Sequence, residues 1–310
     1  MMAYVARRLV FAVVLVFAVS SASMLLARLA PGDYVAESLG ATARPEQIAA
    51  ARERYGLNRS IGEQYRAWLA GVVRLDFGRS MQYDRPVVEL IPERALNTGI
   101  LSLTALALAT LIGLPLGVLT GTRRSGVVPA TIRGVSLILL SLPPLLTSLF
   151  LVFLAAKSGV LPVGGMTSTS GGELLRHMIV PVAALALPLA AMFERLQSQA
   201  MSEVVGQPYV LATFARGVPI RRVIWRGAFR NALRPIASLY GLVAGTLLSG
   251  SFAVEVITAW PGLGQLMLGA LRARDVYLVA GCAAAGSIFL AIGTLLSDAM
   301  LAAVDPRAAE

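Results

Sequence analysis

The sequence predicts an all-α integral membrane protein with six transmembrane helices, and three observations lead to this fold class. Hydrophobic residues make up 56% of the 310 residues, charged residues only 14%, and the mean hydropathy is +0.72. Soluble domains carry about 25% charged residues. Six uncharged runs approach the ~20 residues that a helix needs to cross a hydrocarbon core about 30 Å thick. The composition argues against a soluble enzyme and against a disordered chain.

The six runs follow one another along the chain. The first exceeds the 7–15 apolar residues of a secretory signal peptide, so we expect it to remain as an anchor helix. The fourth run is the shortest and needs an extension at one end to cross the bilayer. The runs are Leu9–Ala27, Thr98–Leu119, Gly134–Ala156, Met178–Phe193, Ile236–Val254 and Val276–Ser297.

Proline residues interrupt three of these runs. Pro115 lies in the second run, Pro143 and Pro144 in the third, and Pro181 and Pro188 in the fourth. Proline kinks a helix and frees backbone carbonyls, which is tolerated in a membrane where protein or a water-filled path satisfies them. Two interpretations stay open, namely helices that move around a translocation path and ordinary packing of membrane helices.

The distribution of basic residues predicts the orientation. Arginines gather before the first run and in the loops between runs two and three and between runs four and five. The long region 30–96 is balanced, with nine arginines and nine acidic residues. Because short cytoplasmic loops collect Arg and Lys, both termini are expected in the cytoplasm. The same rule explains the net charge of +10 without nucleic-acid binding.

The loop 198–235 is long for a simple connector. Tyr209–Arg216 is expected to form a short helix that Gly217 ends. Arg221–Arg234 is expected to form a second, amphipathic helix that ends at Pro235. A basic amphipathic helix can lie on anionic lipid, which fits part of the second helix. The small side chains of the first helix fit a groove on another protein instead.

At this loop the sequence resembles a known family. Tyr209–Gly217, followed by Asn231–Pro235, resembles the coupling loop of permease subunits of binding-protein-dependent ABC importers. The similarity is greatest to the B-type subunit of the dipeptide/oligopeptide/nickel group. Each further matching motif is weak alone, but their order and spacing around six runs make the resemblance specific. These motifs are Leu29–Asp33, Tyr55–Ser60, Asp76–Ser80, Asn97–Thr98, Gly113–Gly117, Leu161–Gly165, Glu255–Gly264 and Asp305–Arg307.

The resemblance implies a type I ABC importer permease fold. It implies a first part, 1–97, with one membrane helix and a long extracytoplasmic region, and a core permease domain, 98–310, with the coupling loop 198–235. Leu211 stands where the general family motif has Glu. Pro261, Gly262 and Gly264 are expected to form an outer turn or gate. The residues that the resemblance assigns to the ATPase-coupling helix are Leu211, Ala212, Thr213, Phe214, Ala215, Arg216 and Gly217.

The resemblance also implies partners. They are a second homologous permease subunit, two cytoplasmic ATPase subunits and an extracytoplasmic substrate-binding protein, in the inner membrane of a bacterium or archaeon. Short peptides are the expected cargo, with nickel and other solutes left open. ATP and Mg²⁺ are expected on the ATPase subunits, and no catalytic, cofactor or metal site is expected in this chain.

The alternative is a solitary secondary transporter or channel, and an intramembrane enzyme is less well supported. A P-loop is not expected, because Leu151 and Ala156 occupy the glycine positions before Lys157-Ser158. A single histidine and a single cysteine argue against metal clusters of His or Cys pairs. Asp298 is the best intramembrane acid. It is either an ion or proton site or an acid at a helix end that reaches water.

Overall fold

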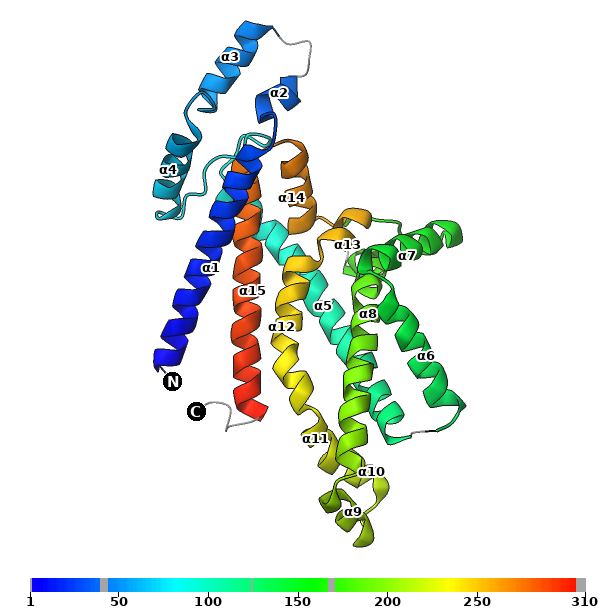
Figure 1. Cartoon of the computed structure of the whole chain (residues 1–310). Coiled ribbons are helices and arrows are strands. Elements are labelled where there is room, and N and C mark those ends of the chain that lie inside the picture. The colour runs from blue at the N-terminus through cyan, green and yellow to red at the C-terminus, as the bar shows by residue number, and fades with distance from the viewer. Residues whose placement is uncertain (1, 40–43, 124, 167–170, 305–310) are drawn as a thin grey trace. The chain divides into compact units, whose positions relative to one another are not determined.

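The computed structural model describes residues 2–39, 44–123, 125–166 and 171–304. Asp305–Arg307, which resembles the C-terminal motif of the family, lies outside these ranges. All regular elements within them are helices (Figure 1). The structure confirms the all-α fold class. In the part of the chain that the structure describes, five helical segments are long and apolar enough to cross a membrane, and a bent pair of helices can supply a sixth span.

The long helices correspond to five of the six runs. Except for α12 (Arg234–Gly250), which ends before the end of the fifth run, they extend beyond the apolar segments. The extension is largest in the fourth run, where a helix of 35 residues contains both Pro181 and Pro188. That run therefore gains length at both ends, and its continuation past Glu194 carries the coupling loop. Four of the spans lie in α1 (Met2–Leu29), α5 (Val87–Thr122), α8 (Gly171–Val205) and α15 (Val276–Val304). The fifth, Leu239–Ile257, runs from α12 into α13 (Phe252–Ile257).

The third run forms two helices, α6 (Val127–Ser141) and α7 (Pro144–Ser158), bent by 106° relative to one another. Pro143 and Pro144 have no N–H groups to continue the hydrogen-bond ladder of α6. The residue before them, Leu142, is extended at φ −95° and ψ 118°, as the steric demand of a following proline requires. The segment is a broken span or a re-entrant pair and not one continuous helix.

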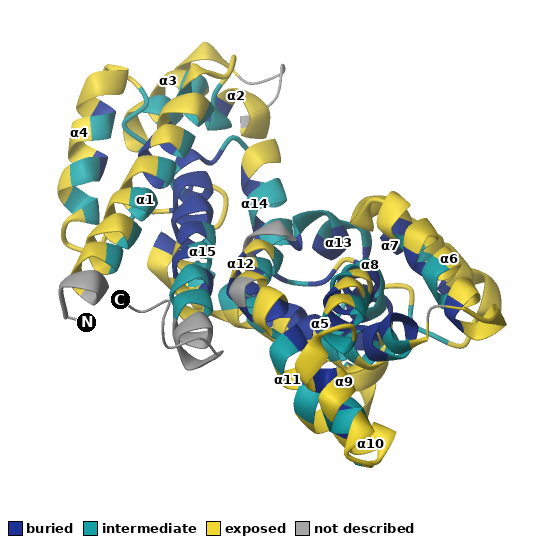
Figure 2. Ribbon diagram, turned by 60° about the horizontal axis from the view of Figure 1, so that its bottom comes forward, coloured by how far each residue is buried: buried dark blue, intermediate teal, exposed yellow. Residues whose placement is uncertain are grey.

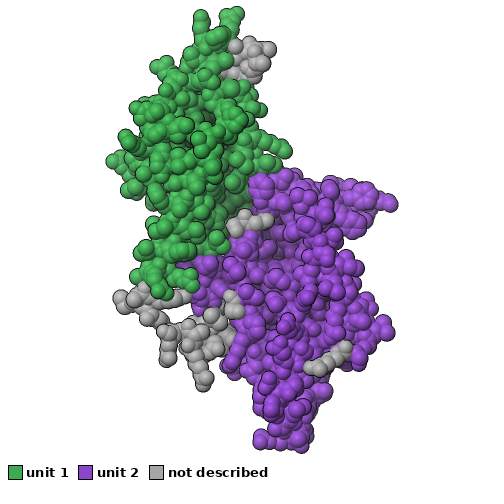
Figure 3. All heavy atoms as spheres, in the orientation of Figure 1, with its two compact units in different colours: residues 1–99, 261–291 green, residues 100–260, 292–310 purple. Residues whose placement is uncertain are grey.

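The chain divides into two compact units, residues 1–99 with 261–291 and residues 100–260 with 292–310 (Figure 3). In the first unit, Asp275 is fully buried and organises the loop before α5. It accepts hydrogen bonds from Ser80 Oγ at 2.6 Å, from the Gln82 N–H at 3.1 Å and from the Leu278 N–H at 3.2 Å. The last bond caps the start of α15. The first unit also contains α2 (Tyr34–Leu39), α3 (Pro45–Arg54), α4 (Ile61–Val72) and α14 (Leu263–Arg272).

In the second unit, α5 and α8 approach closely along a ridge of three glycines spaced four residues apart. A Cβ atom on Gly113 would lie 2.5 Å from the Ala190 carbonyl oxygen, and one on Gly121 would lie 2.5 Å from that of Ser198. The middle glycine, Gly117, is equally tight. Small residues at such spacing allow membrane helices to pack backbone against backbone. The ridge borders the main buried core, which Figure 2 shows in dark blue around α5 and α8.

A second close contact joins α12 to the end of α15. A Cβ atom on Gly241 would overlap the Ser297 backbone, and one on Gly293 would overlap the Gly245 backbone. The remaining helices of the second unit are short. They are α9 (Pro208–Ala215), α10 (Ile220–Arg222), the π-helix η1 (Val223–Ala228), α11 (Phe229–Ala232) and α13 (Phe252–Ile257).

We expect Gly113→Ala to lower the thermal unfolding midpoint of the purified protein in detergent. The added methyl group would force α5 and α8 apart or distort them, at a cost of about 1–3 kcal/mol. Gly99→Ala is the matched control on the same helix, because no atom lies within 4 Å of a Cβ added there. Equal midpoints for the two variants would contradict the role of the glycine ridge.

Candidate functional site

The predicted coupling helix is α9, and backbone chemistry sets both of its ends. Pro208 stands in the first turn, where its missing N–H costs nothing. Arg216 ends the helix, and Gly217 follows at φ +78° while its N–H donates to the Phe214 carbonyl at 2.9 Å. This left-handed conformation favours glycine. The structure therefore places the seven residues from Leu211 to Gly217 in one helix and its terminus.

α9 is attached on one side and bare on the other. Val210 is buried, and the Tyr209 hydroxyl accepts a hydrogen bond of 2.8 Å from Asn231 Nδ2. Leu211 keeps 55% of its surface exposed, and Ala212 and Ala215 are also exposed. The bare face is thus apolar and made of small or flexible side chains, which suits close contact with another protein.

The helical path after α9 differs in part from the expected single helix over Arg221–Arg234. It contains the π-helix η1 and is interrupted by a turn at Leu233. The next helix, α12, then begins with Pro235 in its first turn. Val223 and Ala228 are both buried, and their spacing of five residues matches the hydrogen-bond step of a π-helix. The amphipathic pattern is confirmed. The π segment was not predicted, because its only sequence signal is the spacing of two small apolar residues.

Helix α8 holds α9 well beyond the apolar run. From Glu194, directly after that run, to Val205 the helix rises about 17 Å at about 1.5 Å per residue. The headgroup layer on each side of a bilayer is only about 5–8 Å thick. If the hydrocarbon region ends near Glu194, α9 lies beyond the lipid headgroups. With the boundary at that position, the bare face of α9 would be open to a soluble partner.

Four exposed arginines follow at a spacing of four residues along α10, η1, α11 and the start of α12: Arg222, Arg226, Arg230 and Arg234. Like charges at this spacing repel one another. Among the described residues none of the four forms an ion pair. Two of them, Arg222 and Arg226, line a cavity of about 300 Å³ between α9 and η1, together with Tyr209, Val210 and Thr213. The groove is therefore positively charged.

The expected outer turn lies between α13 and α14. Asn97 Nδ2 donates to the Pro261 carbonyl at 2.9 Å, and the Leu263 N–H donates to Thr98 Oγ1 at 2.8 Å. Gly262 is extended at φ −101° and ψ −171°, and Gly264 already belongs to α14. The left-handed residue of the segment is instead Ala259, at φ +48°. The start of α14 is thus tied to α5 by two polar side chains.

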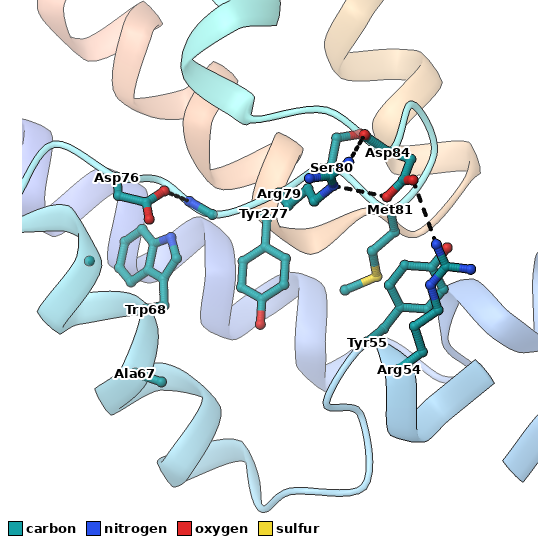
Figure 4. A pocket seen from close by; sticks show the side chains of 12 residues that line it. Arg54, Tyr55, Ala67, Trp68, Asp76, Arg79, Ser80, Met81, Asp84 and Tyr277 are labelled. Atoms are coloured by element: carbon teal, nitrogen blue, oxygen red, sulfur yellow. Dashed lines mark hydrogen bonds and ion pairs between the residues drawn. The ribbon is translucent and has the colours of Figure 1, made fainter. Parts of the chain in front are cut away.

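The first unit contains a pocket of about 600 Å³ beside α4 and the loop before α5 (Figure 4). Trp68, with only 4% of its surface exposed, and Tyr277 form part of its wall. Asp84 pairs with Arg79 at 2.9 Å and with Arg54 at 3.6 Å at its rim. The pocket combines an aromatic wall with a charged rim. The pocket was not predicted from the sequence, because its lining comes from four separate segments.

Comparison with known proteins decides the family. Residues 113–310 match the family described as "Binding-protein-dependent transport system inner membrane component", and residues 1–101 match its N-terminal membrane component. The chain belongs to this family. It is a multi-pass permease component of an ABC transport system in the inner membrane, as the sequence resemblance predicted.

Curated relatives align with the permease over nearly its whole length. The oligopeptide transport system permease protein AppB of Bacillus subtilis is 31% identical over 99% of both chains. The probable peptide ABC transporter permease protein y4tP of Sinorhizobium fredii is 31% identical over 98% of both. The dipeptide transport system permease protein DppB of Escherichia coli is 29% identical over 99% of this permease and 98% of its own length.

The isolated polar candidates of the permease occupy different environments. Asp298 lies half-buried in the last part of α15, and its role stays open. His177 lines a small cavity with Glu173 and Arg176 near the start of α8. Glu194 is a buried carboxylate that accepts a hydrogen bond of 2.5 Å from Thr120 Oγ1.

Proposed function

We propose that this permease is one of two transmembrane subunits of an ATP-driven importer for short peptides. The permeases would form the path between them, with two ATPase subunits on the cytoplasmic side and a substrate-binding protein outside. Peptide cargo is favoured by the names of relatives that align along their full length. Membership of the family argues against the alternative of a solitary transporter or channel.

The observation that carries this proposal is the position of α9. A short helix with a bare apolar face, held about 17 Å beyond the end of an apolar run, has no bilayer to cover it. An ATPase subunit supplies the missing surface, and the permease has no need to bind or hydrolyse ATP itself. The short linkage of α9 to α8 through Gly206 and Gln207 would carry movement of the ATPase into the membrane helices.

The orientation and the outer partner follow from the same assignment. If α9 meets an ATPase, the ends of α5 and α8 near it are cytoplasmic, and the Arg-rich loops agree. Region 30–96, with the pocket beside Trp68 and Tyr277, then faces outward. This region is where we expect the binding protein to dock and release cargo. Both chain termini are proposed to lie in the cytoplasm.

The direct test is ATP hydrolysis by the complex purified through this permease and reconstituted in lipid. Stimulation by a peptide-loaded binding protein is expected for a peptide importer. ATPase activity that is stimulated by another solute but not by peptides would change the proposed cargo and leave the assignment as an ABC transporter unchanged. A purified permease that brings no ATPase with it, under conditions that keep the membrane part folded, would overturn the proposal.

We expect Gly217→Val to abolish most peptide uptake while the permease still inserts in the membrane. A β-branched residue at φ +78° is strained, so α9 would lose its defined terminus and its fit to the ATPase. Gly217→Asn is the matched control, because asparagine tolerates the left-handed conformation. Uptake should therefore fall far less in this control. Uptake by the Val variant equal to that of wild type would contradict the assignment.

We also expect the double variant Arg222→Glu with Arg226→Glu to release the ATPase from the complex at lower salt than wild type. Ion pairs between acidic ATPase side chains and the two arginines, which line the groove between α9 and η1, are screened as the salt concentration rises. Retention of the ATPase on the immobilised permease would be measured across a salt series. The control is Arg221→Glu, an exposed neighbour that does not line the groove. Identical salt profiles for both variants would exclude the groove as a docking contact.

A further inference from the structure

The second unit has a groove of about 590 Å³ between α6 and α8, lined by both apolar and polar side chains. It lies where the apolar run of α8 ends, so it is at the level of the inner membrane boundary in the orientation proposed above. Its volume falls within the range of small-molecule sites. The polar residues of its lining include Arg133 and Ser136 from α6 and Glu194, Arg195, Ser198 and Ser202 from α8.

Glu194 is the anionic group of this groove. Only 2% of its surface is exposed, and one carboxylate oxygen accepts the hydrogen bond from Thr120 Oγ1. The other carboxylate oxygen has no hydrogen-bond partner among the described residues. A glutamate at the end of a membrane span is costly to bury and in such proteins marks a path for substrates or ions. Glu194 therefore has one fixed oxygen and one that can accept a donor from a ligand.

Arg133 is the cationic group, and it is positioned through the same residue. Its Nη2 atom donates to the Thr120 carbonyl at 2.5 Å, whereas the Thr120 hydroxyl binds Glu194. Thr120 thus holds a guanidinium and a carboxylate in one place, using its backbone for the first and its side chain for the second. Arg195, next to Glu194 in the sequence, adds a second and more exposed positive charge.

This combination selects the ligand by charge. A simple anion would meet the Glu194 carboxylate, and a simple cation would meet two guanidinium groups. A molecule with a primary ammonium at one end and a carboxylate or phosphate at the other satisfies both sides. Arginine binds such anionic groups with paired hydrogen bonds, and the serine hydroxyls supply neutral donors and acceptors.

We propose that the groove between α6 and α8 binds a zwitterion, with its ammonium on Glu194 and its anionic group on Arg133 and Arg195. Two sources have this chemistry. One is a short peptide with free termini, which rests on the proposed function and would make the groove a cargo site at the inner end of the path. The other is the phosphoethanolamine headgroup of a lipid in the inner leaflet.

The test uses the complete permease–ATPase complex in nanodiscs without binding protein. The probes are the dipeptide Ala-Ala and its N-acetylated form, which lacks the ammonium, and binding is titrated by saturation-transfer NMR. The variant is Glu194→Gln, whose amide oxygen can still accept the hydrogen bond from Thr120. The control is Glu203→Gln, an exposed residue on the same helix that does not line the groove. Size-exclusion profiles and basal ATP hydrolysis verify that each complex is assembled.

In phosphatidylcholine nanodiscs we expect Glu194→Gln to weaken Ala-Ala binding by about tenfold, the loss of one charge-assisted hydrogen bond. Binding of the acetylated peptide should be weak in wild type and unchanged by the variant. Glu203→Gln should behave as wild type. This pattern assigns the groove to peptide.

If the site belongs to lipid, wild type retains phosphatidylethanolamine from mixed nanodiscs and Glu194→Gln loses it, as measured by native mass spectrometry. Equal binding of both peptides and equal lipid retention in wild type and variant would overturn the inference. Failure of the proposed function can be told apart from failure of this inference. If no ATPase co-purifies with the permease, the permease alone can still be titrated with the same probes.

Discussion

Backbone contact between α5 and α8 is the constraint on which the second unit depends. Lipid is as apolar as the side chains of a membrane helix, so apolar side chains alone give little driving force for association. Gly113, Gly117 and Gly121 remove the side chains that would separate the two backbones. The crossing then brings Thr120 within hydrogen-bonding distance of Glu194. The hydrogen bond between Thr120 and Glu194 thus depends on the close helix packing that the three glycines allow.

The same crossing gives α8 a second role as a rigid support. Its far end stands clear of the apolar run and carries α9, which is attached to α11 by the Tyr209–Asn231 hydrogen bond. The groove beside α6 is lined by α8 residues from Glu194 to Ser202, on the stretch of the helix that also crosses α5. A force applied at α9 would reach the groove through the linkage of Gly206 and Gln207 and then along α8. This arrangement connects the proposed site of ATP coupling to the proposed site of the zwitterion.

Local chemistry made several features predictable. The end of α9 was predicted because Gly217 accepts the left-handed conformation that ends a helix. The break in the third run was foreseeable at Pro143 and Pro144, but not its angle of 106°, since the direction of a kink depends on what each half packs against. The pocket beside Trp68 and the groove at Glu194 were not predicted. Each brings together residues that lie tens to hundreds of positions apart.

By itself the sequence determined the class of the protein, its apolar runs, the bias of its basic loops and the end of the short helix α9 at Gly217. These properties depend on composition and on neighbours within a few residues, because insertion into the bilayer and helix formation respond to the local sequence. Tertiary structure alone decided which polar groups meet. Glu194 has Arg195 beside it in the sequence, yet it bonds to Thr120 on another helix. Helix packing selects that partner, because the approach allowed by Gly117 and its neighbours sets which face of α8 is covered.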